Sequence, residues 1–227
     1  MNNHSAIFMS TEQASPRWQR KKDARPAEIL DAALTLFVEK GFRATKMEDI
    51  ARAANVTKGT PYLYFQNKEE IFKAVVRDTL VPRITNLQAM SAQHEGSCAE
   101  LLVRLLQAWW QDIGSTRMAG LCKLMVAEAA NFPELAAFYQ QEVIVRGRQL
   151  VADALHLGIE RGEFRPVDID SAVECLIAPL LMTVIWNHSF GGIPCCAPAP
   201  AGPPEHYLQQ ALDLVLNGLC TPAQNNN

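Results

Sequence analysis

The chain has 227 residues, of which 48% are hydrophobic and 20% charged, which is enough for a small N-terminal unit and a second domain with its own core. Its net charge of −3 does not by itself favour a nucleic-acid partner, but the charge is distributed unevenly along the chain. Residues 1–83 carry 14 basic and 10 acidic side chains, whereas the remainder carries 7 basic and 14 acidic ones. Only the N-terminal part therefore has the sign of charge that a phosphate backbone attracts.

The apolar segments are short. The longest run, residues 175–186, is shorter than the roughly 20 residues that span a bilayer, and Pro179 interrupts it, so we expect no transmembrane helix. Residues 6–9 form too short an apolar patch for a signal peptide. We therefore expect a cytoplasmic protein.

The cysteine and histidine pattern favours neither a disulfide framework nor a metal site. The six cysteines are scattered along the chain, and no His-Glu-x-x-His or Cys-x-x-Cys spacing occurs. Cys195 and Cys196 have no flanking Lys, Arg or His that would lower a thiol pKa, so we expect an exposed pair without a redox role. No metal and no cofactor are predicted.

Helical periodicity dominates the chain and predicts an all-α fold of about nine helices. Residues 1–23 are expected to form a flexible basic arm that touches DNA when DNA is present, because residues 17–22 are rich in Arg and Lys. The first helix is predicted to begin near Pro26, a favourable first helical position, and to end at Gly41 in a left-handed conformation.

Two short helices follow. The first is predicted to open on Thr45, whose hydroxyl would pair with Glu48 in a capping box, and to end by Asn55. The second is predicted over residues 57–65. Because only Asn55 and Val56 join them, the two helices must cross steeply, and Asn tolerates the left-handed backbone that such a turn requires. Residues 45–65 thus have the pattern of a helix-turn-helix.

A longer helix is predicted to start after Asn67, which with Glu70 repeats the capping pattern, and to run past Arg83 with a kink at Pro82. Five further helices are predicted at residues 99–113, 118–130, 133–161, 168–188 and 204–218. Residues 191–204 are rich in Gly and Pro and are expected to form a loop. Residues 221–227 are expected to be a disordered tail.

The start of the second short helix presents groups that suit DNA. It offers the hydroxyls of Thr57 and Thr60, the ammonium of Lys58 and the bare backbone of Gly59. Hydroxyls and N-terminal amides bind phosphate oxygens, and a lysine can reach a guanine edge or a phosphate. A recognition helix in the major groove uses this end of the helix.

Residues 24–83 resemble the DNA-binding domain of the TetR family of transcriptional regulators. The similar segments are Gly41-Phe42-Arg43-Ala44-Thr45, Asp49-Ile50-Ala51, Val56-Thr57-Lys58-Gly59-Thr60, Tyr62-Leu63-Tyr64-Phe65 and Asn67-Lys68-Glu69-Glu70. The chain departs from the family pattern at Asn55, where Gly is usual, and at Pro61, where an apolar residue such as Leu is usual.

The resemblance implies a homodimer that reads a near-palindromic double-stranded DNA operator, with residues 84–220 as a helical effector-binding and dimerisation domain. By the same resemblance, Lys68 and Tyr64 are expected to contact phosphates, and Lys46 is added because it lies next to Thr45. The residues expected to contact DNA are Thr45, Lys46, Thr57, Lys58, Gly59, Thr60, Tyr62, Tyr64 and Lys68.

Large apolar side chains in the C-terminal domain are candidates to line a pocket for a small apolar or amphipathic effector, although packing in the core or the dimer interface is the better explanation for any single one of them. They are Trp109, Trp110, Met125, Phe138, Met182 and Trp186. Trp109 and Trp110 are about 100° apart around a helix, so they cannot both face one pocket. The candidates for the dimer interface are Leu176, Leu180, Val184, Leu208, Leu212 and Val215.

The sequence therefore predicts a ligand-responsive transcriptional repressor and not an enzyme. An architectural DNA binder without an effector is the nearest alternative, because the volume of a pocket is invisible in a sequence. An all-α enzyme is a more distant one, since no nucleophile–base pair, metal set or phosphate loop is found.

Overall fold

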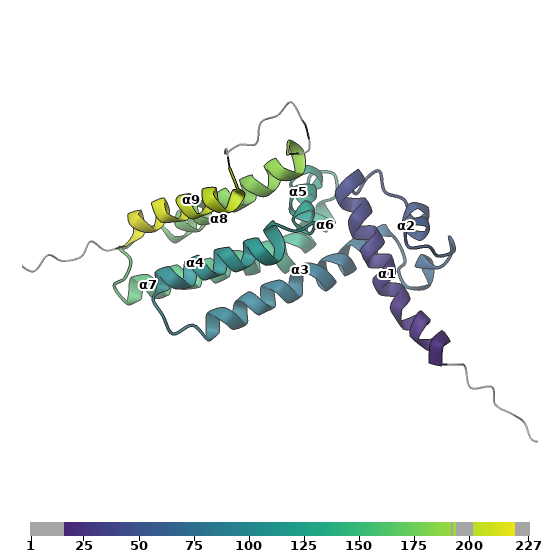
Figure 1. Cartoon of the computed structure of the whole chain (residues 1–227), viewed down its shortest axis with the longest axis horizontal. Coiled ribbons are helices and arrows are strands. Elements are labelled where there is room, and N and C mark those ends of the chain that lie inside the picture. The colour runs from purple at the N-terminus through teal and green to yellow at the C-terminus, as the bar shows by residue number, and fades with distance from the viewer. Residues whose placement is uncertain (1–15, 192, 194–201, 221–227) are drawn as a thin grey trace, which may run out of the picture.

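The computed structural model describes residues 16–191, 193 and 202–220. The predicted all-α fold class is confirmed: apart from one bridge between Phe164 and Cys220, the described residues form no β-pairing. The α-helices, drawn in Figure 1, are α1 (Pro16–Lys40), α2 (Met47–Ala53), α3 (Lys68–Ala92), α4 (Cys98–Trp109), α5 (Ala119–Glu128), α6 (Pro133–Tyr139), α7 (Val145–Glu160), α8 (Ile169–Ser189) and α9 (Pro204–Leu219).

An aromatic cluster holds the N-terminal unit together, which consists of α1, α2, the segment between α2 and α3, and the first turns of α3. The rings of Phe37, Phe42 and Phe72 are fully buried, with centroids 5.3 to 5.8 Å apart. The chain can turn between Phe37 and Phe42 because Gly41 has a φ of +83°, as predicted. Its N–H donates to the Phe37 carbonyl at 3.0 Å and ends α1.

The first helix begins earlier than predicted. α1 starts at Pro16, and Pro26 lies inside it, not at its first position. A proline inside a helix removes one backbone donor, and here the helix continues on both sides of it. Residues 16–23 of the predicted flexible arm are therefore helical, and its residues 1–15 lie outside the described residues.

The predicted capping box at Thr45 is wrong. α2 begins one residue later, after Lys46, whose backbone N–H donates to Asp49 Oδ2 at 3.3 Å. Thr45 is 1% exposed, and its hydroxyl donates to the Gly41 carbonyl at 2.8 Å. The hydroxyl closes the α1–α2 loop instead of capping the helix, because burial brings it next to a backbone acceptor.

The predicted cap of the long helix is confirmed, since the Asn67 side chain accepts a hydrogen bond from the Glu70 N–H at 2.8 Å. α3 then runs without a break across the predicted boundary between residues 83 and 84. The remaining predicted helices are present, but a π-helical turn at Trp110–Gly114 follows α4, and another at Gln140–Ile144 separates α6 from α7. The single helix predicted over residues 133–161 is therefore in three parts.

α8 and α9 lie side by side as an outer layer of the C-terminal domain (Figure 1). α8 has 21 residues, and a window of 18 residues within it has a mean hydropathy of 1.7. By length and composition the helix is therefore apolar enough to cross a membrane, which the shorter apolar run in the sequence did not indicate. One side of α8 packs into the core of the domain through Ala172, Val173, Leu176, Leu180, Thr183 and Val184. Packing against α5 and α7 thus accounts for that side of the helix.

The N-terminal unit and the C-terminal domain share a core. Ile29, Phe37 and Phe72 pack in one buried cluster with Met125 of α5 and Tyr139 of α6. Figure 1 shows α1 crossing next to α5 and α6. α5 and α6 therefore pack directly on the N-terminal unit.

Candidate nucleic-acid interface and ligand cavity

The segment after α2 turns sharply, as the sequence predicts. Asn55 has a φ of +53°, and in the described residues it is the one non-glycine residue with a left-handed backbone. The following helix is shorter than predicted: residues 57–65 contain only a 3-10 turn at Pro61–Leu63.

Pro61 accounts for the shorter helix. It has no N–H to donate to the Thr57 carbonyl, which accepts instead from the Thr60 N–H at 2.9 Å. The next bonds keep this three-residue spacing, with Leu63 N–H to the Thr60 carbonyl at 3.1 Å and Tyr64 N–H to the Pro61 carbonyl at 3.1 Å.

Lys46 and residues 55–65 are here called the tip of the N-terminal unit. The two threonine hydroxyls of the tip that are predicted to contact DNA bind each other. The Oγ1 atoms of Thr57 and Thr60 are 2.8 Å apart. Thr60 is only 6% exposed, while Thr57 and Gly59 are exposed. The Thr60 hydroxyl therefore fixes the turn, and the outward-facing parts of the tip are Thr57 and the backbone at Gly59.

The basic side chains of the tip face solvent. Lys46 is exposed, and the Lys58 ammonium forms an ion pair of 3.1 Å with Glu48 Oε1. The Glu48 backbone N–H and the hydrogen bond from Lys58 lower the pKa of the Glu48 carboxyl. An exposed ion pair of this kind is weak, so Lys58 can exchange it for an anion of a partner.

Lys68, for which the resemblance implies a phosphate contact, bonds within its own chain in this structure. Its ammonium donates to the carbonyls of Phe42 at 2.6 Å and Thr45 at 2.9 Å, and lies 4.3 Å from the centroid of the Phe42 ring. Burial lowers the pKa of Lys68, and the carboxylates of Glu69 and Glu128 oppose that effect. The side chain is directed inward because the carbonyls at the end of the α1–α2 loop lack helical partners.

The aromatic residues of the tip differ in exposure. Tyr62 is 51% exposed, and Tyr64 is half-buried with its ring 6.5 Å from that of Phe65. Leu63, which was not among the predicted DNA-contacting residues, is 78% exposed. No signal in the sequence indicates that this side chain faces outward.

The C-terminal domain contains a partly open cavity of about 460 Å³, here called the large cavity. Its walls come from α3 to α8 and are mostly apolar, and they include two of the predicted residues, Trp109 and Met125. Trp110, Phe138, Met182 and Trp186 are not among its lining residues, so the predicted residues do not all share this one cavity. Other lining residues that the sequence reasoning missed include Leu105, Cys122, Val126, Tyr139, Val143, Gly147 and Ile177.

The polar groups of the large cavity are few. The Tyr139 hydroxyl donates to Cys122 Sγ at 3.2 Å, and burial raises the pKa of both groups, so both are neutral at pH 7. Arg148 and Glu174 form an ion pair at the wall, and Gln140 adds an amide. The cavity thus combines a large apolar surface with one charged pair, which suits an apolar or amphipathic molecule.

The other predicted pocket residues have different surroundings. Trp110 lines a separate groove of about 320 Å³ between α4, α8 and α9, where its indole N–H donates to Glu205 Oε1 at 2.9 Å. The prediction that Trp109 and Trp110 face different spaces is confirmed. The Arg77 guanidinium lies 4.9 Å from the centroid of the Phe138 ring, and Trp186 stacks on Phe190 at 4.8 Å.

The predicted interface residues of α8 face inward. Leu176, Leu180 and Val184 are at most 5% exposed and belong to the core of their own chain, because the most apolar side of α8 faces its own domain. The predicted residues of α9, which are Leu208, Leu212 and Val215, are half-buried against that core.

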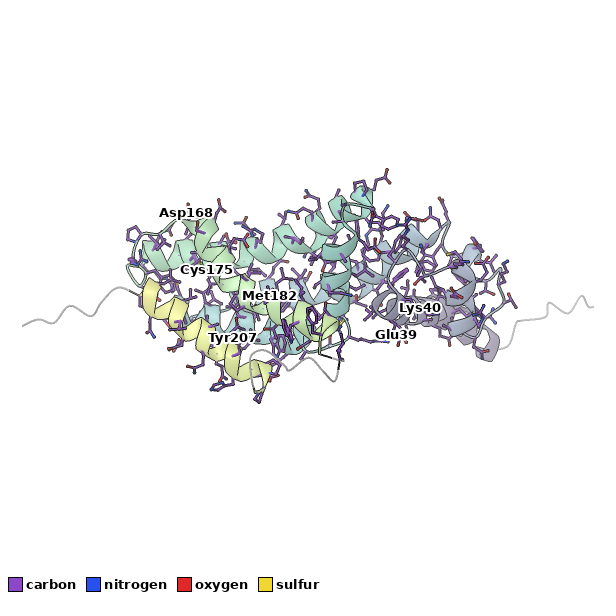
Figure 2. The ribbon with its side chains drawn as sticks, turned by 90° about the horizontal axis from the view of Figure 1, so that it is seen from above. Glu39, Lys40, Asp168, Cys175, Met182 and Tyr207 are labelled. Carbon is purple, nitrogen blue, oxygen red and sulfur yellow. The ribbon has the colours of Figure 1, made fainter. Side chains whose placement is uncertain are left out.

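The opposite side of α8 and α9 carries what we call the outer stripe. It consists of residues that recur at three- and four-residue steps, namely Ser171, Cys175, Ala178 and Met182 on α8 with Tyr207, Gln210 and Leu214 on α9. Met182 is 56% and Leu214 74% exposed. Figure 2, which looks onto α8 and α9, shows Cys175, Met182 and Tyr207 on this layer.

Comparison with known proteins assigns both parts of the chain. Residues 29–75 match the family described as "Bacterial regulatory proteins, tetR family", and residues 92–189 match "Tetracyclin repressor-like, C-terminal domain". The chain is 29% identical over 203 residues to the HTH-type transcriptional repressor KstR2 of Rhodococcus jostii, covering 88% of this chain and 94% of that protein.

Two further relatives agree. The uncharacterized HTH-type transcriptional regulator YfiR of Bacillus subtilis is 32% identical over 148 residues, which cover 64% of this chain and 71% of YfiR. The structure of the ketosteroid transcriptional regulator KstR2 of Mycobacterium tuberculosis superimposes with a TM-score of 0.67 at 25% identity, over 87% of this chain and 95% of that one. With its helix-turn-helix and helical C-terminal domain, this chain is a transcriptional regulator that belongs to the tetR family.

Proposed function

We propose that the protein is a cytoplasmic repressor that binds a near-palindromic operator as a homodimer and is released when a small apolar or amphipathic molecule enters the large cavity. Two residues carry the proposal. Met125 and Tyr139 line the large cavity, and both pack in the core that contains α1 and Phe42. A ligand that displaces either side chain therefore acts on the N-terminal unit without an intermediate element.

Further contacts join the cavity wall to the N-terminal unit. The rings of Phe42 and Phe132 meet edge-on at 4.8 Å, just before α6 begins. At the start of α5, Gly120 lies so close to Val38 of α1 that a Cβ on Gly120 would be 2.5 Å from Val38 Cγ1. Such close packing transmits displacement of a helix instead of absorbing it.

The DNA contacts proposed for the tip divide into two groups. Lys46, Thr57, Lys58, Gly59, Tyr62 and Tyr64 are proposed to touch the operator, since each has surface at the tip. Thr45, Thr60 and Lys68 are proposed to position the tip, because their polar atoms bond within the N-terminal unit.

The outer stripe is proposed as the dimer interface. Its apolar and small side chains on two adjacent helices form a self-complementary surface that suits a two-fold axis. A two-fold dimer would place the two tips at half-sites about 34–36 Å apart, which is one turn of DNA.

An architectural DNA binder without an effector is the less favoured alternative. The volume of the large cavity lies within the roughly 300–1,000 Å³ typical of small-molecule sites. The ketosteroid regulator among its relatives supports an effector with a large apolar body and few polar groups.

The test selects an operator from random DNA with the purified full-length protein and then measures operator affinity with sodium oleate, sodium cholate or progesterone present. We expect at least one probe to weaken operator binding, and the operator to weaken binding of that probe by the same factor. A probe that binds the large cavity and leaves operator affinity unchanged would contradict the proposed switch.

A matched pair of variants locates the effect. A Cβ on Gly147, which lines the cavity, would have no neighbour within 4 Å. Gly147→Phe should fill the cavity and abolish the response to the probe while operator binding persists, whereas Gly147→Ala should keep the response.

A further inference from the structure

The tip of the N-terminal unit presents a large apolar side chain to solvent. Leu63 is 78% exposed, more than any other large apolar side chain in the described part of the chain. It ends the 3-10 turn that the buried residue Pro61 begins, so its position is fixed by the backbone. No packing within this chain accounts for a leucine at that place.

Some of the polar groups of the tip bond within the N-terminal unit. The hydroxyls of Thr57 and Thr60 bond to each other, and the Lys58 ammonium pairs with Glu48. The side chain of Leu63 has no such commitment and projects from the surface that is proposed to meet DNA. In the major groove, the apolar group that a base pair offers is the C5-methyl of thymine.

We infer that Leu63 is a specificity-determining residue that recognises one thymine methyl in each half-site of the operator. The inference rests on the proposed operator binding by this tip. DNA is the partner indicated because the tip also exposes Lys46 and Lys58, and residues 1–83 carry four more basic than acidic side chains. DNA offers these ammonium groups a uniformly negative surface, whereas the surface of a protein partner carries both signs of charge.

The experiment replaces thymidine by deoxyuridine, which removes the methyl and leaves every hydrogen-bonding group of the base pair in place. Each thymine of the selected operator is replaced in turn, symmetrically in both half-sites. Affinity is then measured by fluorescence anisotropy for the wild type, Leu63→Ala and Lys58→Ala. Thermal melting confirms that the variants fold, which we expect because both side chains are exposed.

At one symmetric position, deoxyuridine should weaken wild-type binding by about fourfold for each methyl removed, because this is the affinity expected from burying one methyl group. Leu63→Ala should bind the thymine and deoxyuridine operators equally, while Lys58→Ala should be weaker on both and keep the wild-type ratio. If the wild type ignores every replacement, or Leu63→Ala keeps its full sensitivity, the inference is overturned. Failure of the wild type to select any sequence would instead overturn the proposed operator binding itself.

Discussion

The ammonium of Lys68 lies 2.6 Å from the carbonyl oxygen of Phe42, a residue 26 positions earlier in the chain. The same ammonium donates to the Thr45 carbonyl at 2.9 Å. The first residue of α3 thereby holds the loop that joins α1 to α2, and with it the orientation of α2. A residue that a motif assigns to DNA is in this structure part of the support for the tip.

Lys68→Met should therefore destabilise the fold. Losing hydrogen bonds from a charged donor to buried carbonyls costs about 1–3 kcal/mol. Urea denaturation monitored by circular dichroism measures this change in the free energy of unfolding. Lys73→Met is the control, because Lys73 makes only an ion pair with Glu70 at 3.2 Å near the surface and its loss should cost less than about 1 kcal/mol. Equal losses in the two variants would contradict the supporting role of Lys68.

Lys58→Ala should weaken operator binding and leave the dimer intact. If Lys58 meets a phosphate, the slope of log affinity against log salt should fall by about one per half-site. Glu48→Gln is the matched variant, since it frees Lys58 from its 3.1 Å ion pair and removes a negative charge from the tip, and it should strengthen binding. Anisotropy titrations at several salt concentrations distinguish these outcomes. An unchanged affinity in both variants would show that Lys58 does not contact the operator.

A charge on the outer stripe should disrupt the dimer. Met182→Glu and Leu214→Glu each place a carboxylate on this exposed surface. In a two-fold dimer the same carboxylate of the second protomer would also be buried in the apolar contact, which is unfavourable. Sedimentation velocity should show a monomer, or a dissociation constant raised by at least tenfold. Gln93→Glu adds the same charge at an exposed residue away from the outer stripe and should leave the dimer unchanged.

Phe132→Leu should reduce the coupling between ligand and operator. Its ring packs against Phe42 at 4.8 Å, and an aromatic pair contributes about 0.5–1.5 kcal/mol beyond its buried area. The measured quantity is the factor by which a bound probe weakens operator affinity, and we expect it to fall severalfold. Glu134→Gln, an exposed change in the first turn of α6, is the control. A factor preserved in Phe132→Leu would place the coupling elsewhere.

The contact between Trp110 and Glu205 should depend on pH. The hydrogen bond from the Trp110 indole is the main cause of the lowered pKa of the Glu205 carboxyl. Because the folded pKa is below the unfolded one, this contribution to stability is present above pH 4.5 and is lost as the pH falls through the folded pKa. Glu205 is exposed, so the contribution should not exceed about 1 kcal/mol.

Trp110→Phe should return the pKa of Glu205 toward 4.5, its ordinary value. Carbon-detected NMR of the carboxyl through an acid titration measures this directly. An unchanged pKa would mean that α9 does not hold Glu205 against Trp110 in solution.

Much of the N-terminal unit could be predicted from local sequence. Gly41 and Asn55 were expected to adopt left-handed backbones and do so, and Asn67 was expected to cap a long helix and does. These features depend on the conformational preference of one residue or on a hydrogen bond within three residues. The 3-10 turn at Pro61–Leu63, which replaces the helix predicted over residues 57–65, is equally local in origin, because Pro61 has no N–H to donate.

Sequence by itself determined most of the helices, the turn at Asn55 and the family, because periodicity, caps and turn residues act over a few positions. Tertiary structure alone decided that Lys68 and Thr45 face inward, that the outer side of α8 is the side of Met182, and that a cavity lies behind Met125. The physical reason is that a helical repeat fixes which side chains share a face of a helix. Which neighbour covers that face depends on segments far away in the chain.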